Sequence, residues 1–260
     1  MDFMEFKDEA AELLNLNLDG YKLKRVKRRT NSLMRRQDVD DYEECLKLLE
    51  TDSEFRSAYM NHFTINTSEF FRNPDSFQYM REEILPDLIS NQKNLKIWSA
   101  PCSNGSEPYT IAIQLLEMGV DPGRFTLLAS DIDPGILKTA SRGVFPAKAL
   151  KNMSEDLKEK YFSSLEEHDD RYQLSQEIID LVEFEKKDLI NDSYRSGWDL
   201  ILSRNFFIYL TRELKEELTE KFVSALRPGG YLFLGNTEFI FNPGDYDLDK
   251  VHLSFYRKQE

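Results

Sequence analysis

Acidic side chains at the ends of predicted strands are the residues of this sequence best placed to do chemistry. Glu107 lies in the loop after an apolar run at 95–100, and Asp131 directly follows a second apolar run at 125–130. Ligands of open α/β sheets bind outside the carboxyl ends of the strands, where loops and helix N-termini meet. A carboxylate in the position of Asp131 can accept two hydrogen bonds from a ribose diol, so the pattern indicates a nucleoside-type ligand.

Two more polar residues follow predicted strands. Asn205 comes after an apolar run at 198–203, and Asp188 comes after a short strand candidate, where its carboxylate could accept a hydrogen bond from an adenine amino group. Gly105 could permit a close backbone approach to a ligand. The chain contains neither GxGxxG nor GxxxxGK[ST], so spacing alone predicts a nucleotide-type α/β enzyme and does not name the nucleotide.

Asp131 has a structural alternative to ligand binding. It could instead cap the helix that is expected to begin near Pro134, since aspartate is a preferred N-cap residue. Asp133 fits the capping role better, and we therefore leave Asp133 out of the candidate site.

The elements that must position these side chains alternate between strands and helices after Phe77. A helix is predicted from Pro108 to Met118, and a fourth strand at 231–236 follows the turn RPGG. This order predicts a parallel sheet with covering helices. The alternation is interrupted over residues 143–187, where RYQLSQ and LVEFEKK are short strand candidates that we assign to an inserted lobe above the carboxyl edge of the sheet.

The first 60 or so residues are predicted to be helical, and one of the helices is strongly basic. The stretch 21–36 reads YKLKRVKRRTNSLMRR, with eight basic residues and no acidic one, on a chain of net charge -13. The overall acidity argues against general affinity for nucleic acid. A single positive element on a negative body suggests a docking surface for an anionic partner, with an ordinary solvated helix face as the alternative.

Composition also limits the compartment. No stretch approaches the roughly 20 consecutive apolar residues of a membrane span, and the start MDFMEFKDEAAELL has the features of neither a secretory signal nor a transit peptide. Cys45 and Cys102 lack metal-ligand spacing, so we expect free thiols, no metal site and a cytoplasmic protein.

Five segments are more specific than these patterns. They are FTINTSEFFRNPDSF (63–77), IWSAPCSNGSEPYTIA (97–112), LLASDIDPGIL (127–137), DLILSRNFFIYL (199–210) and LRPGGYLFLGNTEFI (226–240). In order and spacing they resemble the CheR-type chemotaxis methyltransferases, and the likeness extends over nearly the whole chain. The resemblance implies an α/β fold with a Rossmann-like class I methyltransferase sheet. It further implies a helical N-terminal domain at 1–62, a methyltransferase domain at 63–260 and an inserted antiparallel β-subdomain at about 143–187.

The function implied by the resemblance is transfer of a methyl group from S-adenosylmethionine to glutamate side chains of chemoreceptors for sensory adaptation. The products would be glutamate methyl esters and S-adenosylhomocysteine. The alternatives are a non-catalytic S-adenosylmethionine-binding signalling module and a methyltransferase for another substrate, such as RNA. We expect a monomer that binds the cytoplasmic helical region of receptors without inserting into the membrane.

The resemblance also assigns residues. The implied cofactor contacts are Asn66, Ser68, Arg72, Ala100, Glu107, Asp131, Asp188, Leu189, Asn205 and Phe206. Arg72 and Tyr209 correspond to residues close to the methyl group and the incoming substrate. A substrate glutamate is ionised near neutral pH, with a reference pKa of about 4.3, so the reaction needs no general base. We expect Arg72 to orient the cofactor or the substrate carboxylate, and Tyr209 to donate a hydrogen bond.

Several positions depart from the family pattern SAxCSTGEEPY and its neighbours. Pro101 stands where a small residue is usual, Asn104 replaces Thr, and Ser106 replaces the first Glu. Asp188 replaces a frequent Asn, and Ser203 a frequent Cys. Proline removes a backbone donor and stiffens the loop, so cofactor affinity could differ from the family's.

The resemblance assigns the basic helix to receptor docking. The candidate residues are Arg25, Arg28, Arg29, Arg35 and Arg36, with Arg29 and Arg35 favoured by family position. Some members hold a receptor pentapeptide through a glycine-containing loop of the inserted lobe. The chain has no glycine between Val144 and Ser196, so we predict that it does not depend on this tether.

Overall fold

The computed structural model describes residues 1–63, 68–165 and 170–260 in two compact units, of which the first is helical. It contains α1 (Phe3–Leu14), α2 (Leu23–Arg36), α3 (Tyr42–Thr51) and α4 (Ser53–Phe63), and the segment Phe207–Glu217 also belongs to it. The helices predicted in this part of the sequence are confirmed.

Side chains at helical spacing build the core of this first unit. Phe6 of α1 stacks on Tyr42 of α3 with ring centroids 5.3 Å apart, and Val26 is buried on the inward stripe of α2. Thr30 and Tyr59 share a buried hydrogen bond of 3.0 Å between α2 and α4. The basic side chains of α2 therefore lie on the faces of the helix outside this buried stripe.

The second unit holds a seven-stranded sheet in the order β6-β2-β1-β7-β8-β10-β9. Its first five strands are parallel, and β10 and β9 form an antiparallel hairpin at one edge. The strands are β1 (Leu95–Ser99), β2 (Phe125–Asp131), β6 (Val182–Lys186), β7 (Trp198–Ser203), β8 (Leu226–Leu234), β9 (Leu248–His252) and β10 (Phe255–Lys258). Each predicted parallel strand is present, and the predicted sheet is confirmed.

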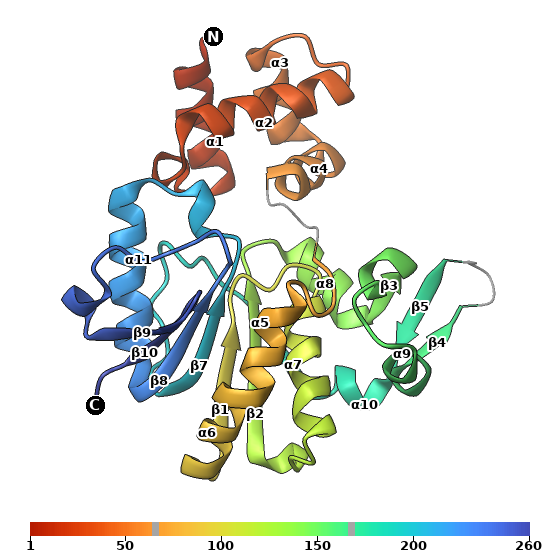
Figure 1. Cartoon of the computed structure of the whole chain (residues 1–260). Helices are drawn as coiled ribbons and strands as arrows, with labels where there is room; N and C mark the ends of the chain where they lie inside the picture. The colour runs from red at the N-terminus through yellow and green to blue at the C-terminus, as the bar shows by residue number, and fades with distance from the viewer. Residues whose placement is uncertain (64–67, 166–169) are drawn as a thin grey trace. The chain divides into compact units, whose positions relative to one another are not determined.

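Helices cover both faces of this sheet. The helices are α5 (Pro74–Tyr79), α6 (Leu85–Asn91), α7 (Ser106–Glu117), α8 (Pro134–Arg142) and α11 (Arg212–Ala225), of which the part from Leu218 on belongs to this unit. Figure 1 shows α5, α6 and α7 grouped on one face, with α11 on the other. The packing agrees, because Phe77 of α5 meets Phe233 of β8 on the first face, whereas Trp98 of β1 meets Phe222 of α11 on the second.

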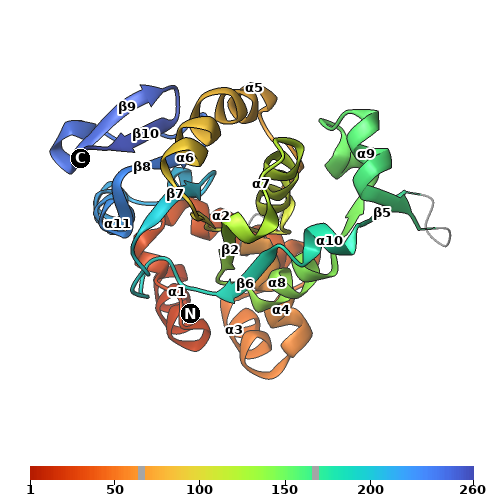
Figure 2. The same ribbon diagram turned by 90° about the horizontal axis from the view of Figure 1, so that it is seen from below.

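The inserted lobe contains a separate antiparallel sheet in the order β3-β5-β4. Its strands β3 (Val144–Pro146), β4 (Phe162–Ser164) and β5 (Arg171–Leu174) are accompanied by α9 (Glu155–Tyr161) and α10 (Gln176–Ile179). Figure 2 shows the lobe beyond the edge strand β6, at the opposite edge of the sheet from the β9–β10 hairpin.

Two sequence-based expectations differ from the structure. The segment LVEFEKK was assigned to the inserted lobe, but β6 pairs in parallel with β2 in the main sheet, where Phe184 opposes Ala129. Its polar alternation reflects an edge strand, which is covered on one face and open on the other. The fourth predicted strand was placed at 231–236, whereas β8 begins at Leu226, bulges between its pairings with β7 and ends at Leu234.

Candidate functional site

Asp131 lies at the carboxyl end of β2, and its carboxylate holds the neighbouring loop. Oδ2 accepts a hydrogen bond from the backbone N–H of Ser103 at 2.9 Å, and Oδ1 accepts one from the N–H of Asp133 at 3.1 Å. The residue is 4% exposed, and burial raises the pKa of Asp131 to about 6. The cap of α8 is Asp133, as predicted, because its side chain accepts from the N–H groups of Gly135 and Ile136. Asp131 is therefore not needed as a helix cap.

Glu107 occupies the first turn of α7 and is buried in a polar cluster. Its Oε1 accepts a hydrogen bond from Ser99 Oγ at 2.7 Å, and its Oε2 forms an ion pair with Arg204 Nη1 at 3.1 Å. An acidic residue at a helix N-terminus is also favoured by the helix dipole. The prediction that Glu107 lies beside the end of β1 is confirmed, but its partner Arg204 was not predicted.

Arg204 connects three segments that are far apart in the sequence. Beyond Glu107, its Nη2 donates to the carbonyl oxygen of Arg72 at 2.7 Å and to Asn73 Oδ1 at 2.8 Å. The guanidinium lies over the rings of Phe77 and Phe233, with its carbon 5.1 and 4.6 Å from the ring centroids. Burial lowers the pKa of Arg204 from its ordinary value, although an arginine remains charged at neutral pH.

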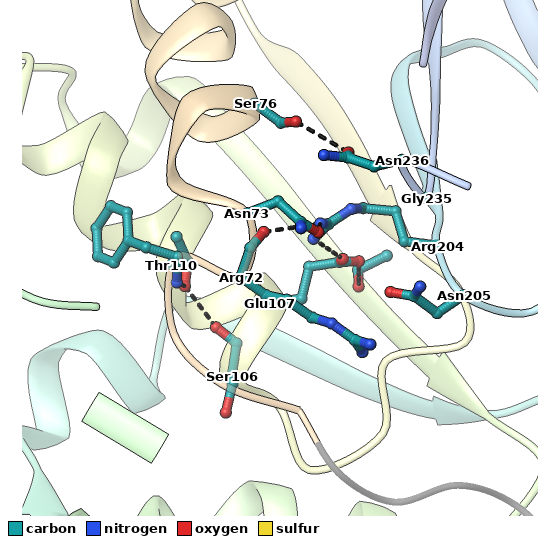
Figure 3. A network of polar contacts seen from close by, with 12 residues as sticks. Arg72, Asn73, Ser76, Ser106, Glu107, Thr110, Arg204, Asn205, Gly235 and Asn236 are labelled. Carbon is teal, nitrogen blue, oxygen red and sulfur yellow. Dashed lines mark hydrogen bonds and ion pairs between the residues drawn. The ribbon is translucent and has the colours of Figure 1, made fainter. Parts of the chain in front are cut away.

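Because its carbonyl is held by Arg204, Arg72 has its backbone anchored while its side chain stays half-exposed. In Figure 3 the Arg72 guanidinium and the Asn205 side chain point to the same side of this polar network. Arg72 and Arg204 are both positively charged, and the repulsion between them contributes to the lowered pKa of Arg204. A half-exposed cation on an anchored backbone is suited to meeting an anionic group from outside the protein.

Asn205 follows β7 in the left-handed region, with φ of +58°. Its backbone N–H donates to Glu238 Oε2 at 2.7 Å, and the N–H of Gly235 donates to the same oxygen at 2.7 Å. A Cβ at Gly235 would lie 2.6 Å from that oxygen and 2.9 Å from the Asn205 nitrogen, so the close approach requires glycine. Glu238, which no sequence pattern marked, thus holds the backbone of Asn205.

The loop between β1 and α7 is held at both sides despite its departures from the family pattern. Pro101 lacks an N–H, but the next residue, Cys102, donates its N–H to the Ser130 carbonyl oxygen at 2.8 Å. On the other side of the loop, the side-chain amide of Asn104 donates to the Ser68 carbonyl oxygen at 3.2 Å. Ala100 is buried and donates its N–H to Leu202 at 2.8 Å. Burial raises the pKa of the Cys102 thiol well above its ordinary value, so this cysteine is a neutral packing residue.

Asp188 and Leu189 form the turn that follows β6. Asp188 Oδ1 accepts hydrogen bonds from the N–H groups of Ile190 and Asn191, and its Oδ2 accepts one from the Asn191 amide. The predicted adenine acceptor therefore already caps its own turn. Leu189 is buried, Phe206 is half-buried, and Asn66 lies outside the described residues.

Tyr209 and the basic helix belong to the helical unit. The Arg25 guanidinium lies over the Tyr209 ring at 5.0 Å, and the N–H of Lys22 donates to the Tyr209 carbonyl at 2.9 Å. Arg29 is half-buried and donates to the carbonyl of His62, and burial lowers the pKa of Arg29. The three remaining docking candidates, Arg28, Arg35 and Arg36, are exposed.

Comparison with known proteins identifies the family of the chain. A family model described as the CheR methyltransferase SAM binding domain matches residues 66–253, and one described as the CheR methyltransferase all-alpha domain matches residues 1–64. The chain belongs to the CheR methyltransferase family.

Curated CheR relatives match along most of the chain. A chemotaxis protein methyltransferase of Listeria innocua is 35% identical over 258 residues, which cover 99% of this chain and 97% of that protein. One of Borreliella burgdorferi is 31% identical over 272 residues, covering 97% and 94%. One of Salmonella typhimurium is 33% identical over 221 residues, covering 82% and 75%.

The residues of this CheR chain fit S-adenosylmethionine. The site contains a carboxylate, Asp131, of the kind that a ribose diol needs as an acceptor, and a half-exposed cation, Arg72, of the kind that pairs with a carboxylate. The hydroxyl oxygens of Ser103 and Ser106, in the loop beside Asp131 and at the start of α7, are buried and have no hydrogen-bond partner in the described part of the chain. Among the described residues, no cluster of three or more His, Cys, Asp or Glu side chains could hold a metal ion. No described helix is long and apolar enough to cross a membrane.

Proposed function

We propose that this chain transfers the methyl group of S-adenosylmethionine to glutamate side chains of methyl-accepting chemoreceptors, giving glutamate methyl esters and S-adenosylhomocysteine. The observation that carries the proposal is the site at the carboxyl ends of β1, β2 and β7, where Asp131, Glu107 and Asn205 gather in a chain of the CheR family. The names of the curated relatives support chemotaxis as the process.

Bound S-adenosylmethionine would supply an electrophilic methyl group on a sulfonium. The chain's own residues have three tasks in such a transfer: to hold the nucleoside, to place the substrate carboxylate and to exclude water. Asp131 is assigned to the ribose. Glu107 is assigned to the cofactor's ammonium group, since an ionised carboxylate can accept more hydrogen bonds than the two that Ser99 and Arg204 donate to it. The further contacts proposed for the cofactor are Asn66, Ser68, Ala100, Asp188, Leu189, Asn205 and Phe206.

Catalysis by such a site rests on positioning. A carboxylate nucleophile is ionised at neutral pH, so no proton needs to be removed. The polar network of Arg72, Glu107, Asp131, Arg204 and Asn205 contains no histidine, and it is suited to this chemistry. We assign Arg72 to orienting the reacting groups and Tyr209 to donating a hydrogen bond, with the carboxylate held about 3–3.5 Å from the methyl carbon.

The exposed part of the basic helix is assigned to receptor docking. The side chains of Arg28, Arg35 and Arg36 point to solvent, whereas Arg29 is tied to His62 within its own unit. We therefore transfer the main docking role from Arg29 to these three residues, with Arg25 as a secondary contact. The proposal that the chain acts without the pentapeptide tether is tested by adding a receptor C-terminal pentapeptide, which should not bind.

The test is methylation of a purified cytoplasmic receptor fragment with radiolabelled S-adenosylmethionine, followed by alkali. Methyl esters are base-labile, so we expect volatile labelled methanol from the wild-type reaction and none from Asp131→Ala, which should also lose cofactor binding in calorimetry. Label that resists alkali would indicate N-methylation. Cofactor binding without any transfer would indicate a signalling module.

A further inference from the structure

Residues 238–241 alternate between anchored and exposed side chains just after β8. Glu238 and Ile240 are buried, at 4% and 8% exposure, whereas Phe239 and Phe241 are 54% and 65% exposed. Two exposed phenylalanines in four residues are unusual for a soluble surface, which normally scatters such side chains.

The two exposed rings are held in place by their neighbours. Glu238 Oε2 accepts from the N–H groups of Asn205 and Gly235, and the N–H of Ile240 donates to the Tyr256 hydroxyl at 3.1 Å. The rings of Phe239 and Phe241 contact each other edge to face, with centroids 4.7 Å apart. Aromatic side chains on an anchored backbone lose little conformational entropy on binding, which is the property of interface hot spots.

This aromatic pair adjoins the edge of the sheet where the candidate site lies. The carboxylate that precedes Phe239 is the one that holds Asn205, and Gly235 lies against the Asn205 backbone. The turn between β9 and β10 reaches the same edge, since Leu234 donates its N–H to the Ser254 carbonyl at 2.9 Å, and its Leu253 is 69% exposed. Exposed apolar side chains therefore border Asn205, which is assigned to the cofactor.

The segment that carries the two phenylalanines exposes no charge of its own. Between Gly235 and Gly244 the sequence GNTEFIFNPG contains one charged residue, Glu238, and that residue is buried. This stretch is therefore a neutral apolar surface, whereas the exposed carboxylates of Asp245 and Asp247 follow it directly, so a partner would be held here by apolar contact and not by charge.

We propose that Phe239 and Phe241, with Leu253, dock an apolar stripe of the substrate helix that carries the glutamate to be methylated. The inference rests on the proposed function and adds a second receptor contact to the one assigned to the basic helix. A helix whose apolar residues lie three or four positions from the glutamate can lay that stripe on the phenylalanines while the carboxylate enters the site.

The experiment measures Phe239→Ser/Phe241→Ser against wild type and against Leu13→Ser, a matched removal of an exposed apolar side chain from α1. A purified cytoplasmic receptor fragment is the probe. Its Kd is measured by calorimetry, its KM and kcat by methylation, and the Kd for S-adenosylmethionine separately. We expect the double variant to raise Kd and KM for the fragment at least tenfold, with kcat at saturation and cofactor Kd within twofold of wild type. Leu13→Ser should match wild type.

The outcomes separate the docking proposal from the proposed function. Methylation by the double variant with unchanged KM and Kd for the fragment overturns the docking surface and leaves the function standing. Fragment binding that depends on the phenylalanines, without methylation, supports the surface and overturns the function. A wild-type chain that neither binds nor methylates the fragment overturns both. A dimer of the wild-type chain that the double variant dissociates in sedimentation would identify the pair as a self-association site instead.

Discussion

Removal of the Arg204 guanidinium should destabilise the second unit strongly. The Arg204 side chain is 2% exposed and that of its partner Glu107 is 10% exposed, with 3.1 Å between the charged atoms. Arg204→Met keeps an apolar side chain against Phe77 and Phe233, but among the described residues it leaves Ser99 as the side-chain donor to the Glu107 carboxylate. Breaking a buried ion pair from one side costs about 3–5 kcal/mol, because an uncompensated charge stays buried.

The loss can be measured by denaturant unfolding followed by tryptophan fluorescence. The chain has two tryptophans, Trp98 on β1 and Trp198 on β7, and both report on the sheet of the second unit. The control is Arg195→Met, which removes an arginine whose side chain is 58% exposed and pairs with Glu185 at 3.2 Å. Exposed pairs contribute about 0–1 kcal/mol, so the control should change the free energy of unfolding little.

A second variant shows whether the buried charge is the cause. Adding Glu107→Gln to Arg204→Met removes the uncompensated carboxylate, so the double variant should recover at least about 1 kcal/mol relative to Arg204→Met alone. If Arg204→Met costs less than about 1 kcal/mol, as the surface control does, the reasoning from burial and pairing is refuted.

Three further predictions concern the site. Burial raises the pKa of Asp131 to about 6, and protonation of its carboxylate removes an acceptor lone pair. The affinity for S-adenosylmethionine should therefore fall as the pH drops through 6. Constant affinity from pH 8 to 5 in calorimetry would contradict this. Arg72→Ala should lower kcat/KM at least tenfold without loss of stability, because Arg204 holds the backbone carbonyl of residue 72 and not its side chain; near-normal kinetics would remove the side chain from the mechanism. Gly105→Ala should destabilise the fold by at least about 1 kcal/mol more than Gly119→Ala. Both glycines have positive φ, but a Cβ at Gly105 would lie 2.9 Å from the Tyr109 ring, whereas a Cβ at Gly119 would meet nothing within 4 Å. Equal shifts of the melting temperature in the two variants would contradict the prediction.

Short-range patterns in the sequence predicted much of this protein correctly. The N-cap role of Asp133 and the helix at Leu23–Arg36 follow from hydrogen bonds and packing between residues at most a few positions apart. The ends of the strands that bear Asp131 and Asn205 follow from the buried apolar runs before them. The family motifs added the assignment to the CheR methyltransferases, because five ordered blocks identify a fold that local propensity does not.

Contacts between distant segments were decided by the tertiary structure alone. Arg204 meets Glu107 across 97 residues, and it does so because β7 lies beside β1 in the sheet. The same applies to Glu238, which accepts a hydrogen bond from the N–H of Asn205 across 33 residues. It applies also to Arg29, which is half-buried and donates to the His62 carbonyl, so that it does not belong to the exposed basic face. No local signal marks these pairings, because an arginine or glutamate has the same helix propensity and charge pattern whether its partner is water or a buried counter-ion. The sequence by itself predicted that Glu107, Asp131 and Asn205 follow strands of one sheet, and the order of strands in that sheet determined that Arg204 pairs with Glu107.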